Sequence, residues 1–286
     1  MSWQHWLLAA RPKTLSAATA PVIVGTALAL RDRHRVEWIY VACALFGALF
    51  IQIATNLIND ALDFKKGADT HERLGPLRVT QAGLLNADHV LRGAYVCLFV
   101  AALFGVPLIV HGGWPVVIIG VASIVMAYAY TGGPYPLAYH GLGELFVMIF
   151  FGIIAVGGTY FVLTLEYSMD ALLCGVAVGS LAVVILAINN LRDIDGDRAS
   201  NKRTIATRIG EQGARIEIVM FVIVAYAAIR SIMVLISLPL AIALLARVYR
   251  SKGRELNRCL AMAGALQWAF SLLFLAGVLL RIGGWR

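Results

Sequence analysis

Asn56-Leu-Ile-Asn-Asp60-Ala-Leu-Asp63-Phe-Lys-Lys-Gly67-Ala-Asp69 follows a long apolar run and carries three carboxylates and two amides. The stretch would make about four helical turns. On a helix, Asn56, Asp60 and Asp63 share one face, and Asn59 lies one turn before Asp63. Acids at the C-terminal end of a helix repel one another and oppose the macrodipole, whose negative end lies there. We therefore expect this stretch to bind something positively charged.

The rest of the chain is unusually apolar. Of its 286 residues, 60% are hydrophobic, and its mean hydropathy is +0.80, well above the range of soluble domains. Apolar runs long enough to cross a bilayer recur along the whole length. The sequence therefore predicts an all-α, polytopic membrane protein that forms one domain over residues 1–286, without a separate soluble domain.

We expect about nine transmembrane helices around a central cavity. The predicted spans are 14–31, 36–62, 88–111, 114–131, 141–164, 170–192, 213–229, 232–249 and 259–281. The region Ile216–Ala246 is interrupted only at Arg230. As a single helix it would measure ~46 Å, against a ~30 Å hydrocarbon core, so we expect two short helices that turn near Arg230 and Ser231.

The basic residues predict the orientation of these spans. With a cytoplasmic amino terminus, eighteen of the 24 Lys and Arg residues lie on the cytoplasmic side, as the positive-inside rule requires. The short turn Arg31–Arg35 is the one connection that opposes this bias. Because the formal charge of +8 is distributed in this way, we expect membrane lipid and not nucleic acid as a partner, and we place the protein in the plasma (inner) membrane.

A second acidic cluster follows the sixth predicted span. Asn189, Asp193 and Asp197 are spaced i, i+4 and i+8, which places them on one helical face. Spans two and six run in the same direction, so both acidic clusters are predicted at the cytoplasmic side. Chemistry should therefore take place at that face of the membrane.

Two carboxylate clusters flanked by Lys and Arg fit a metal that bridges protein to phosphate. Mg²⁺ prefers oxygen ligands and is often held by a few carboxylates together with substrate phosphates. Basic residues neutralise the remaining phosphate charge. Departure of an allylic diphosphate needs this arrangement, because pre-placed cations stabilise the negative charge that develops on the leaving group.

Other interpretations remain open at this point. The acids of each cluster could be solvated loop residues paired with nearby Lys and Arg. A transporter or channel would also use membrane acids, but usually in mid-span, whereas these acids lie at span ends. A phosphotransferase for lipid head groups would use Asp and Mg²⁺ as well, but its Asp-Gly-x-x-Ala-Arg motif is absent from the sequence.

Several motifs, taken in order, resemble the UbiA superfamily of intramembrane aromatic prenyltransferases. They are Arg11-Pro-Lys-Thr14, Asn59-Asp-x-x-Asp63-Phe-x-x-Gly-x-Asp69, Gly75-Pro-x-Arg78-x-Thr-Gln81, Tyr130-Thr-Gly-Gly-Pro134, Gly141-Leu-Gly-Glu144, Asn190-x-Arg192-Asp193 and Lys202-x-Thr204. In detail they are most similar to the 1,4-dihydroxy-2-naphthoate prenyltransferases of menaquinone synthesis. The hydroxybenzoate branch has a Lys-Arg pair where this chain has Tyr139-His140, which argues against that branch.

The resemblance implies an activity and a set of site residues. It implies Mg²⁺-dependent transfer of a polyprenyl group from an allylic diphosphate to 1,4-dihydroxy-2-naphthoate with decarboxylation, giving demethylmenaquinol. Other aromatic acceptors, such as hydroxybenzoate, homogentisate or the acceptor of a phytyl transfer, stay open. The implied metal site consists of Asn59, Asp63, Asp69, Asn189, Asp193 and Asp197. The implied diphosphate ligands are Arg78, Lys65, Arg192 and Lys202.

Three further residues are candidates for contact with the reacting groups. The ring of Tyr130 could stabilise an allylic cation, although tyrosines also mark the membrane interface. Glu144 could orient an acceptor hydroxyl or cap the fifth span. Arg11 could pair with the acceptor carboxylate, although it also satisfies the positive-inside rule. Asp63 and Asp193, as the central acids of the two clusters, are predicted to be essential for catalysis.

Overall fold

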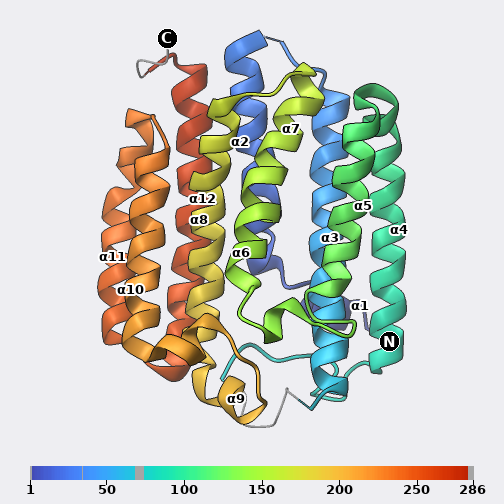
Figure 1. Cartoon of the computed structure of the whole chain (residues 1–286), viewed down its shortest axis with the longest axis vertical. Helices are drawn as coiled ribbons and strands as arrows, with labels where there is room; N and C mark the ends of the chain where they lie inside the picture. The colour runs from blue at the N-terminus through green and yellow to red at the C-terminus, as the bar shows by residue number, and fades with distance from the viewer. Residues whose placement is uncertain (1, 34, 68–73, 283–286) are drawn as a thin grey trace.

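A computed structural model describes residues 2–33, 35–67 and 74–282, and all regular structure in these ranges is helical. The long elements form an upright bundle (Figure 1). The helices are α1 (Trp3–Ala10), η1 (Pro12–Thr14), α2 (Ser16–Arg33), α3 (Trp38–Lys65), α4 (Ala87–Gly112), α5 (Trp114–Ala129), η2 (Leu137–Tyr139), α6 (Gly143–Met148), the π-helical η3 (Ile149–Ile153), α7 (Ile154–Thr164), α8 (Met169–Arg192), α9 (Ile194–Ala199), α10 (Ile205–Ala228), η4 (Ile232–Ser237), α11 (Leu238–Arg250), η5 (Gly253–Glu255) and α12 (Leu256–Leu279).

In the described part of the chain, long helical segments stand at the predicted positions, but only some pass the requirements for a membrane span. Among these described residues, six helices are long and apolar enough to cross a membrane, and there are seven if α1–η1 and α2, which are bent by 52°, count as one span. α5 has only 16 residues, and the first half of α10 carries charged side chains. The all-helical, multi-pass prediction is confirmed.

The predicted turn near Arg230 is confirmed. α10 ends at Ala228, the backbone is extended at Ile229, and η4 begins at Ile232. The predicted spans 170–192 and 213–229 imply a loop over residues 192–213, and this expectation is wrong. This segment contains α9 and the start of α10, which bends at Gly210, where φ is 77°.

α8 is the centre of the bundle. Within its most apolar 18 residues, 72% are buried, and the largest hydrophobic core lies where α8 meets α2, α10 and α12. The π-helical η3 crosses α8 closely because both sides are glycine. A Cβ atom on Gly152 would come within 2.4 Å of the carbonyl oxygen of Gly175, so any larger residue at position 152 would push the helices apart.

The basic turn Arg31–Arg35, which opposes the positive-inside bias, is largely neutralised by acids at the same end of the bundle. The guanidinium of Arg31 lies 2.5 Å from the carboxylate of Asp32 and 2.9 Å from that of Asp170. Arg33 pairs with Glu166. Because opposite charges accompany two of its three arginines, this turn adds little net positive charge to its side of the membrane.

Candidate active site

The ends of α3 and α8 meet at one pocket, although the helices are far apart in the sequence. The pocket has a volume of about 510 Å³. At its polar end it is lined by ten of the residues singled out from the sequence, which are Arg11, Asn59, Asp63, Arg78, Tyr130, Glu144, Asn189, Arg192, Asp193 and Lys202. The ends of α3 and α8 that carry Asp63 and Asp193 lie at the bottom of the bundle, where α9 also lies (Figure 1).

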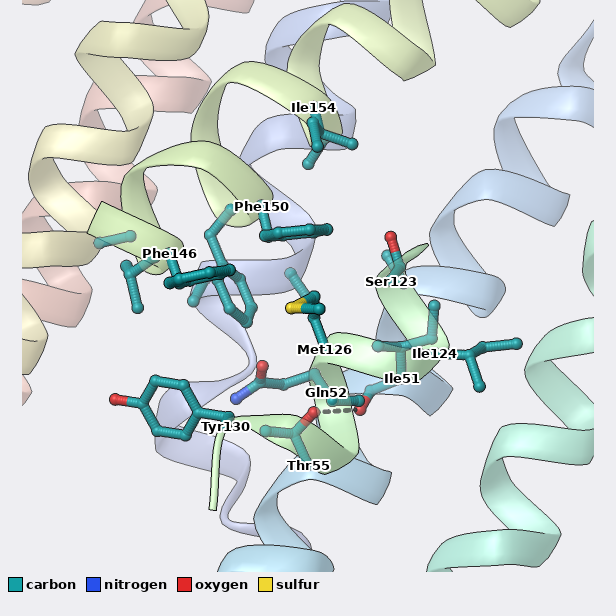
Figure 2. Close-up of a pocket in the computed structure, with 18 of the residues that line it drawn as sticks. Ile51, Gln52, Thr55, Ser123, Ile124, Met126, Tyr130, Phe146, Phe150 and Ile154 are labelled. Carbon is teal, nitrogen blue, oxygen red and sulfur yellow. Dashed lines mark hydrogen bonds between the residues drawn. The ribbon is translucent and has the colours of Figure 1, made fainter. Parts of the chain in front are cut away.

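The remainder of the pocket is mainly apolar. Figure 2 shows Phe146, Phe150 and Ile154 along one wall and Ile124 and Ile51 along another. The rings of Phe146 and Phe150 are stacked with their centroids 6.0 Å apart. An extended hydrocarbon chain fits such a lining, because a hydrocarbon has no polar groups that would lose hydrogen bonds to water on entering the pocket.

Asp63 is the buried centre of the first acidic cluster. The hydroxyl of Tyr139 donates to its Oδ1 at 2.9 Å, and Nη2 of Arg78 lies 2.9 Å from its Oδ2. Arg78 also donates through Nη1 to the carbonyl oxygen of Asn59 at 2.7 Å. Arg78 thus holds the connection after α3 against the last turns of that helix, with its positive charge beside the pocket.

The helical face predicted from spacing alone lies only partly against the pocket, which Asn56 and Asp63 line and Asp60 does not. Asp60 is 1% exposed and accepts hydrogen bonds from the backbone N–H groups of Val79 and Thr80 at 3.2 and 3.1 Å. It therefore stabilises the segment that carries Arg78. Asn56 borders the pocket, but its amide donates to Ala10 O and Thr14 Oγ1 at 2.9 and 3.0 Å.

The second cluster has the same composition. Both carboxylate oxygens of Asp193 accept from Arg192, at 2.8 Å from Nε and 2.5 Å from Nη2. The third guanidinium nitrogen of Arg192 donates to Asn257 Oδ1 at 2.8 Å. Asn189, one turn earlier on α8, borders the pocket as well. Each cluster therefore pairs an acid at the end of a long helix with an arginine, which is Arg192 at the end of α8 and Arg78 in the connection after α3.

Asp197 lies behind this cluster on α9 and does not line the pocket. Its Oδ1 is 3.5 Å from Nζ of Lys202, and its buried Oδ2 has no hydrogen-bond partner among the described residues. Burial raises the pKa of Asp197, and Lys202 partly offsets this effect. An unsatisfied buried carboxylate oxygen favours a cation or a donor as a further partner.

Tyr139 connects the two clusters and was overlooked as a site residue in the sequence. Besides its hydrogen bond to Asp63, its ring lies below Nζ of Lys66 at 4.7 Å and near Nζ of Lys202 at 5.8 Å. Such distances allow cation–π attraction. In the sequence, Tyr139 follows Tyr130 in a stretch rich in turn residues. Nothing in that stretch indicates the contacts of Tyr139 to α3 and to the segment after α9.

The structure separates the two adjacent lysines at the end of α3. Nζ of Lys65 lies 2.5 Å from a carboxylate oxygen of Asp88 on α4, and Lys65 does not line the pocket. Lys66 instead donates to the carbonyl oxygen of Thr131 at 2.5 Å. Lys66 does not line the pocket either, but Thr131 does, so Lys66 is the one of the two lysines that contacts a pocket-lining residue. Asp69 lies outside the described residues.

Glu144 and Gln52 border the pocket, and each has a buried side-chain oxygen that lacks a hydrogen-bond partner among the described residues. Glu144 is 3% exposed. Its Oε1 accepts from Asn190 at 2.8 Å, and its Oε2 has no hydrogen-bond partner in the described part of the chain. Gln52, which the sequence analysis did not single out, also borders the pocket (Figure 2), and its buried Oε1 is likewise unsatisfied within the described ranges. A signal was present, since Gln52 lies one turn before Asn56 inside an apolar run.

The donor set fits a metal that is shared with substrate. Among the described residues, no three His, Cys, Asp or Glu side chains lie close enough together to hold an ion. The carboxylates of Asp63 and Asp193 nevertheless border one pocket, which the amide side chains of Asn59 and Asn189 also line. Arg78 and Arg192 form ion pairs with these two carboxylates. Mg²⁺ commonly takes only one or two carboxylates and completes its coordination with water and phosphate oxygens.

Comparison with known proteins supplies the family. The sequence profile of the UbiA prenyltransferase family matches residues 18–273. The chain belongs to this family. The protein is therefore a UbiA-family prenyltransferase, and its multi-pass membrane architecture agrees with that assignment.

Two relatives and one solved structure illustrate the likeness. The 1,4-dihydroxy-2-naphthoate octaprenyltransferase of Escherichia coli (strain K12) is 38% identical over 218 residues, which cover 74% of this chain and 70% of the relative. The enzyme of the same name from Mycobacterium tuberculosis is 35% identical and covers 83% of this chain and 80% of its own. A UbiA homolog from Archaeoglobus fulgidus, solved with GPP and Mg²⁺, shares the fold with a TM-score of 0.68 at 14% identity, over 96% of this chain and 99% of that chain.

Proposed function

We propose that this UbiA-family enzyme transfers a polyprenyl group from an allylic diphosphate to 1,4-dihydroxy-2-naphthoate, with loss of carbon dioxide, in menaquinone synthesis. The relatives at 35–38% identity carry that activity in their names. The observation that carries the proposal is the pocket itself. It joins two acid–arginine pairs, Asp63 with Arg78 and Asp193 with Arg192, to an apolar chamber suited to a hydrocarbon chain.

The protein would cross the plasma membrane nine times, with its amino terminus and the polar end of the pocket on the cytoplasmic side. α1 and the far end of α12 lie at opposite ends of the bundle (Figure 1), which agrees with an odd number of crossings. The excess of Lys and Arg at the end that holds α9 supports the orientation. The pocket would be the central cavity, open to the cytoplasmic side.

Mg²⁺ would be held between the two acidic clusters. The oxygen ligands are assigned to Asn59, Asp63, Asp69, Asn189, Asp193 and Asp197. When bound, the metal supplies positive charge that stabilises the departing diphosphate. Because Asp63 and Asp193 are already turned toward Arg78 and Arg192, the diphosphate would be received by carboxylate-bound metal on one side and by guanidinium groups on the other.

The diphosphate oxygens would be bound by Arg78, Arg192 and Lys202. We replace Lys65 by Lys66 in this set, because Lys65 pairs with Asp88 whereas Lys66 lies near Tyr139. Burial lowers the pKa of Lys66, and the charge of Asp63 counteracts this effect. A fully charged Lys66 is therefore favoured when a diphosphate adds negative charge nearby.

The reaction would take place between the polar and apolar parts of the pocket. The carbon–oxygen bond to the diphosphate breaks, and the ring carbon that carries the carboxylate forms the new bond to the allylic carbon. The carbon–carbon bond to the carboxylate then breaks, which releases carbon dioxide and returns the electron pair of that bond to the ring. Tyr130 lies at this boundary, where its ring face would stabilise the allylic cation. Glu144 and Gln52 present unsatisfied oxygens that would accept the acceptor's hydroxyl groups, and Arg11 would pair with its carboxylate.

A direct assay tests the function. Purified protein in detergent is incubated with labelled polyprenyl diphosphate and, in parallel, 1,4-dihydroxy-2-naphthoate, 4-hydroxybenzoate or homogentisate. We expect prenylated product and released carbon dioxide with the naphthoate alone, and loss of both on addition of EDTA with recovery on addition of Mg²⁺. Product with another acceptor but none with the naphthoate would contradict the proposal.

A further inference from the structure

A second cavity opens where α11 turns into α12. It has a volume of about 640 Å³ and shares no lining residue with the active-site pocket. We call it the arginine groove, and its lining consists of Ala243, Ala246, Arg247, Arg250, Ser251, Arg254, Glu255 and Arg258. Four guanidinium groups thus face one cavity with a single carboxylate.

No acidic side chain in the described part of the chain pairs with the four arginines of the groove. Within the described residues, none of them makes an ion pair or a side-chain hydrogen bond, and Nε of Arg247 is buried without a partner. The neighbouring Lys252, in contrast, lies 3.6 Å from Glu211. Because a guanidinium group stays protonated in proteins, the groove cannot relieve its repulsion by losing protons. An external anion would relieve it.

The helix ends around the groove favour an anion over a cluster of solvated cations. Arg247 and Arg250 lie in the last turn of α11, where the macrodipole stabilises positive charge. Arg254 and Arg258 lie at the start of the 24-residue α12, where the dipole disfavours it. The start of a helix is also a favourable place for a phosphate, because the positive end of the helix dipole lies there.

The turn that carries the groove is held in place by hydrogen bonds from α10. Arg215 on α10 is 6% exposed. It donates to the carbonyl oxygens of Val248 at 2.9 Å and Ser251 at 3.2 Å. The backbone at the end of α11 is therefore held in place before any ligand arrives, which reduces the entropy lost on binding.

The surroundings of the groove indicate a lipid and not a soluble anion. The turn between α11 and α12, which carries its lining residues, lies at the lower end of the bundle, as α9 does (Figure 1). Directly above it, α11 presents Ile242, which is 64% exposed, and Tyr249 at its lower end is 54% exposed. An aromatic residue at a helix end and an apolar surface beyond it are typical of the membrane interface.

We propose that the arginine groove binds the phosphodiester head group of an anionic phospholipid, with the acyl chains lying along α11. Basic pockets between transmembrane helices on the cytoplasmic side have the chemistry for such head groups. This site is separate from the prenyl-transfer pocket, so lipid binding at the groove does not depend on the proposed reaction.

Thermal unfolding in mixed micelles tests the proposal. The full-length protein is heated in a zwitterionic detergent with increasing phosphatidylglycerol or phosphatidylcholine. We expect the unfolding midpoint to rise with phosphatidylglycerol only, because a ligand bound to the folded state stabilises it. The double variant Arg254→Gln/Arg258→Gln should need a roughly 30-fold higher fraction of phosphatidylglycerol for the same rise. Both side chains are exposed, so the fold should survive.

A matched control separates the groove from bulk charge. Arg92→Gln/Lys252→Gln removes the same charge from the same side of the protein outside the groove and should respond to phosphatidylglycerol as the unchanged protein does. The proposal would be overturned if the control lost as much of its response to phosphatidylglycerol as the groove variant, or if the groove variant responded as the unchanged protein does. Soluble glycerol phosphate should have no effect at the same concentration. An equal rise with glycerol phosphate would show that the groove takes free phosphate and not lipid.

Discussion

The hydroxyl of Tyr139 donates a 2.9 Å hydrogen bond to Oδ1 of Asp63, in a pocket where Arg78 occupies the other carboxylate oxygen. Asp63 comes from the end of α3, whereas Tyr139 belongs to the loop between α5 and α6. The same tyrosine ring lies beneath Lys66 and near Lys202. One side chain thus orients the first acid and connects it to the cations of both clusters.

Replacing Tyr139 by Phe should lower turnover about tenfold while leaving the protein folded. The change removes one hydrogen bond to a charged group, an interaction worth roughly 1.5–3 kcal/mol, but keeps the ring beneath Lys66. Steady-state kinetics at saturating Mg²⁺ would measure the loss. Tyr135→Phe is the matched control, because Tyr135 lies in the same loop, is 57% exposed and does not line the pocket. Equal losses in the two variants would contradict the role of Tyr139.

Asp60→Asn should destabilise the protein without changing its dependence on Mg²⁺. Asp60 accepts from two backbone N–H groups and from the hydroxyl of Thr80, so an amide nitrogen would face donors. A buried hydrogen-bond mismatch costs roughly 1–3 kcal/mol, which should lower the thermal midpoint by several degrees. A changed Mg²⁺ activation curve at unchanged stability would instead place Asp60 among the metal ligands.

Gln52→Leu should raise the KM for the aromatic acceptor and leave that for the prenyl diphosphate nearly unchanged. The unsatisfied Oε1 of Gln52 faces the pocket above the polar end, where an acceptor hydroxyl would donate to it. Gln267→Leu serves as the control, because Gln267 is buried in α12 away from the pocket. An unchanged acceptor KM in the Gln52 variant would remove this residue from the acceptor site.

Tyr130→Phe should retain much more activity than Tyr130→Leu. A cation–π contact in a desolvated site is worth about 2 kcal/mol, and phenylalanine keeps the aromatic face whereas leucine does not. Both variants are compared by single-turnover rates at saturating substrates. Equal losses would indicate that the hydroxyl or the volume of Tyr130 matters and that its ring face does not.

The sequence predicted the positions of the long helices well because hydrophobic runs of that length have few alternatives. It also singled out Asp63 and Asp193, since acids at the end of an apolar run are costly unless they bind something, and both of them line the pocket. Spacing alone, however, could not distinguish Asp60 from Asp63. Both lie on one face of α3, and only the loop carrying Val79 and Thr80 decides which of them it covers.

Contacts between distant segments account for the remaining differences. Lys65 and Lys66 are equivalent in sequence, but Asp88 on α4 attracts Lys65. Tyr139 gains its role from a loop that folds back, with the N–H of Ala138 donating to the carbonyl oxygen of Tyr130 at 2.9 Å. The connection after α8 was predicted to be a loop because its charged residues obscured the helical pattern of α9.

The most direct test of the account is Mg²⁺-dependent prenyl transfer by Asp63→Asn and Asp193→Asn. Each variant removes one carboxylate charge but keeps the size of the side chain, so the protein should stay folded in detergent. The account predicts that both variants lose transfer to 1,4-dihydroxy-2-naphthoate at every Mg²⁺ concentration. Substantial transfer by either variant, with an unchanged Mg²⁺ activation curve, would contradict the central claim that the two helix ends form one metal–diphosphate site.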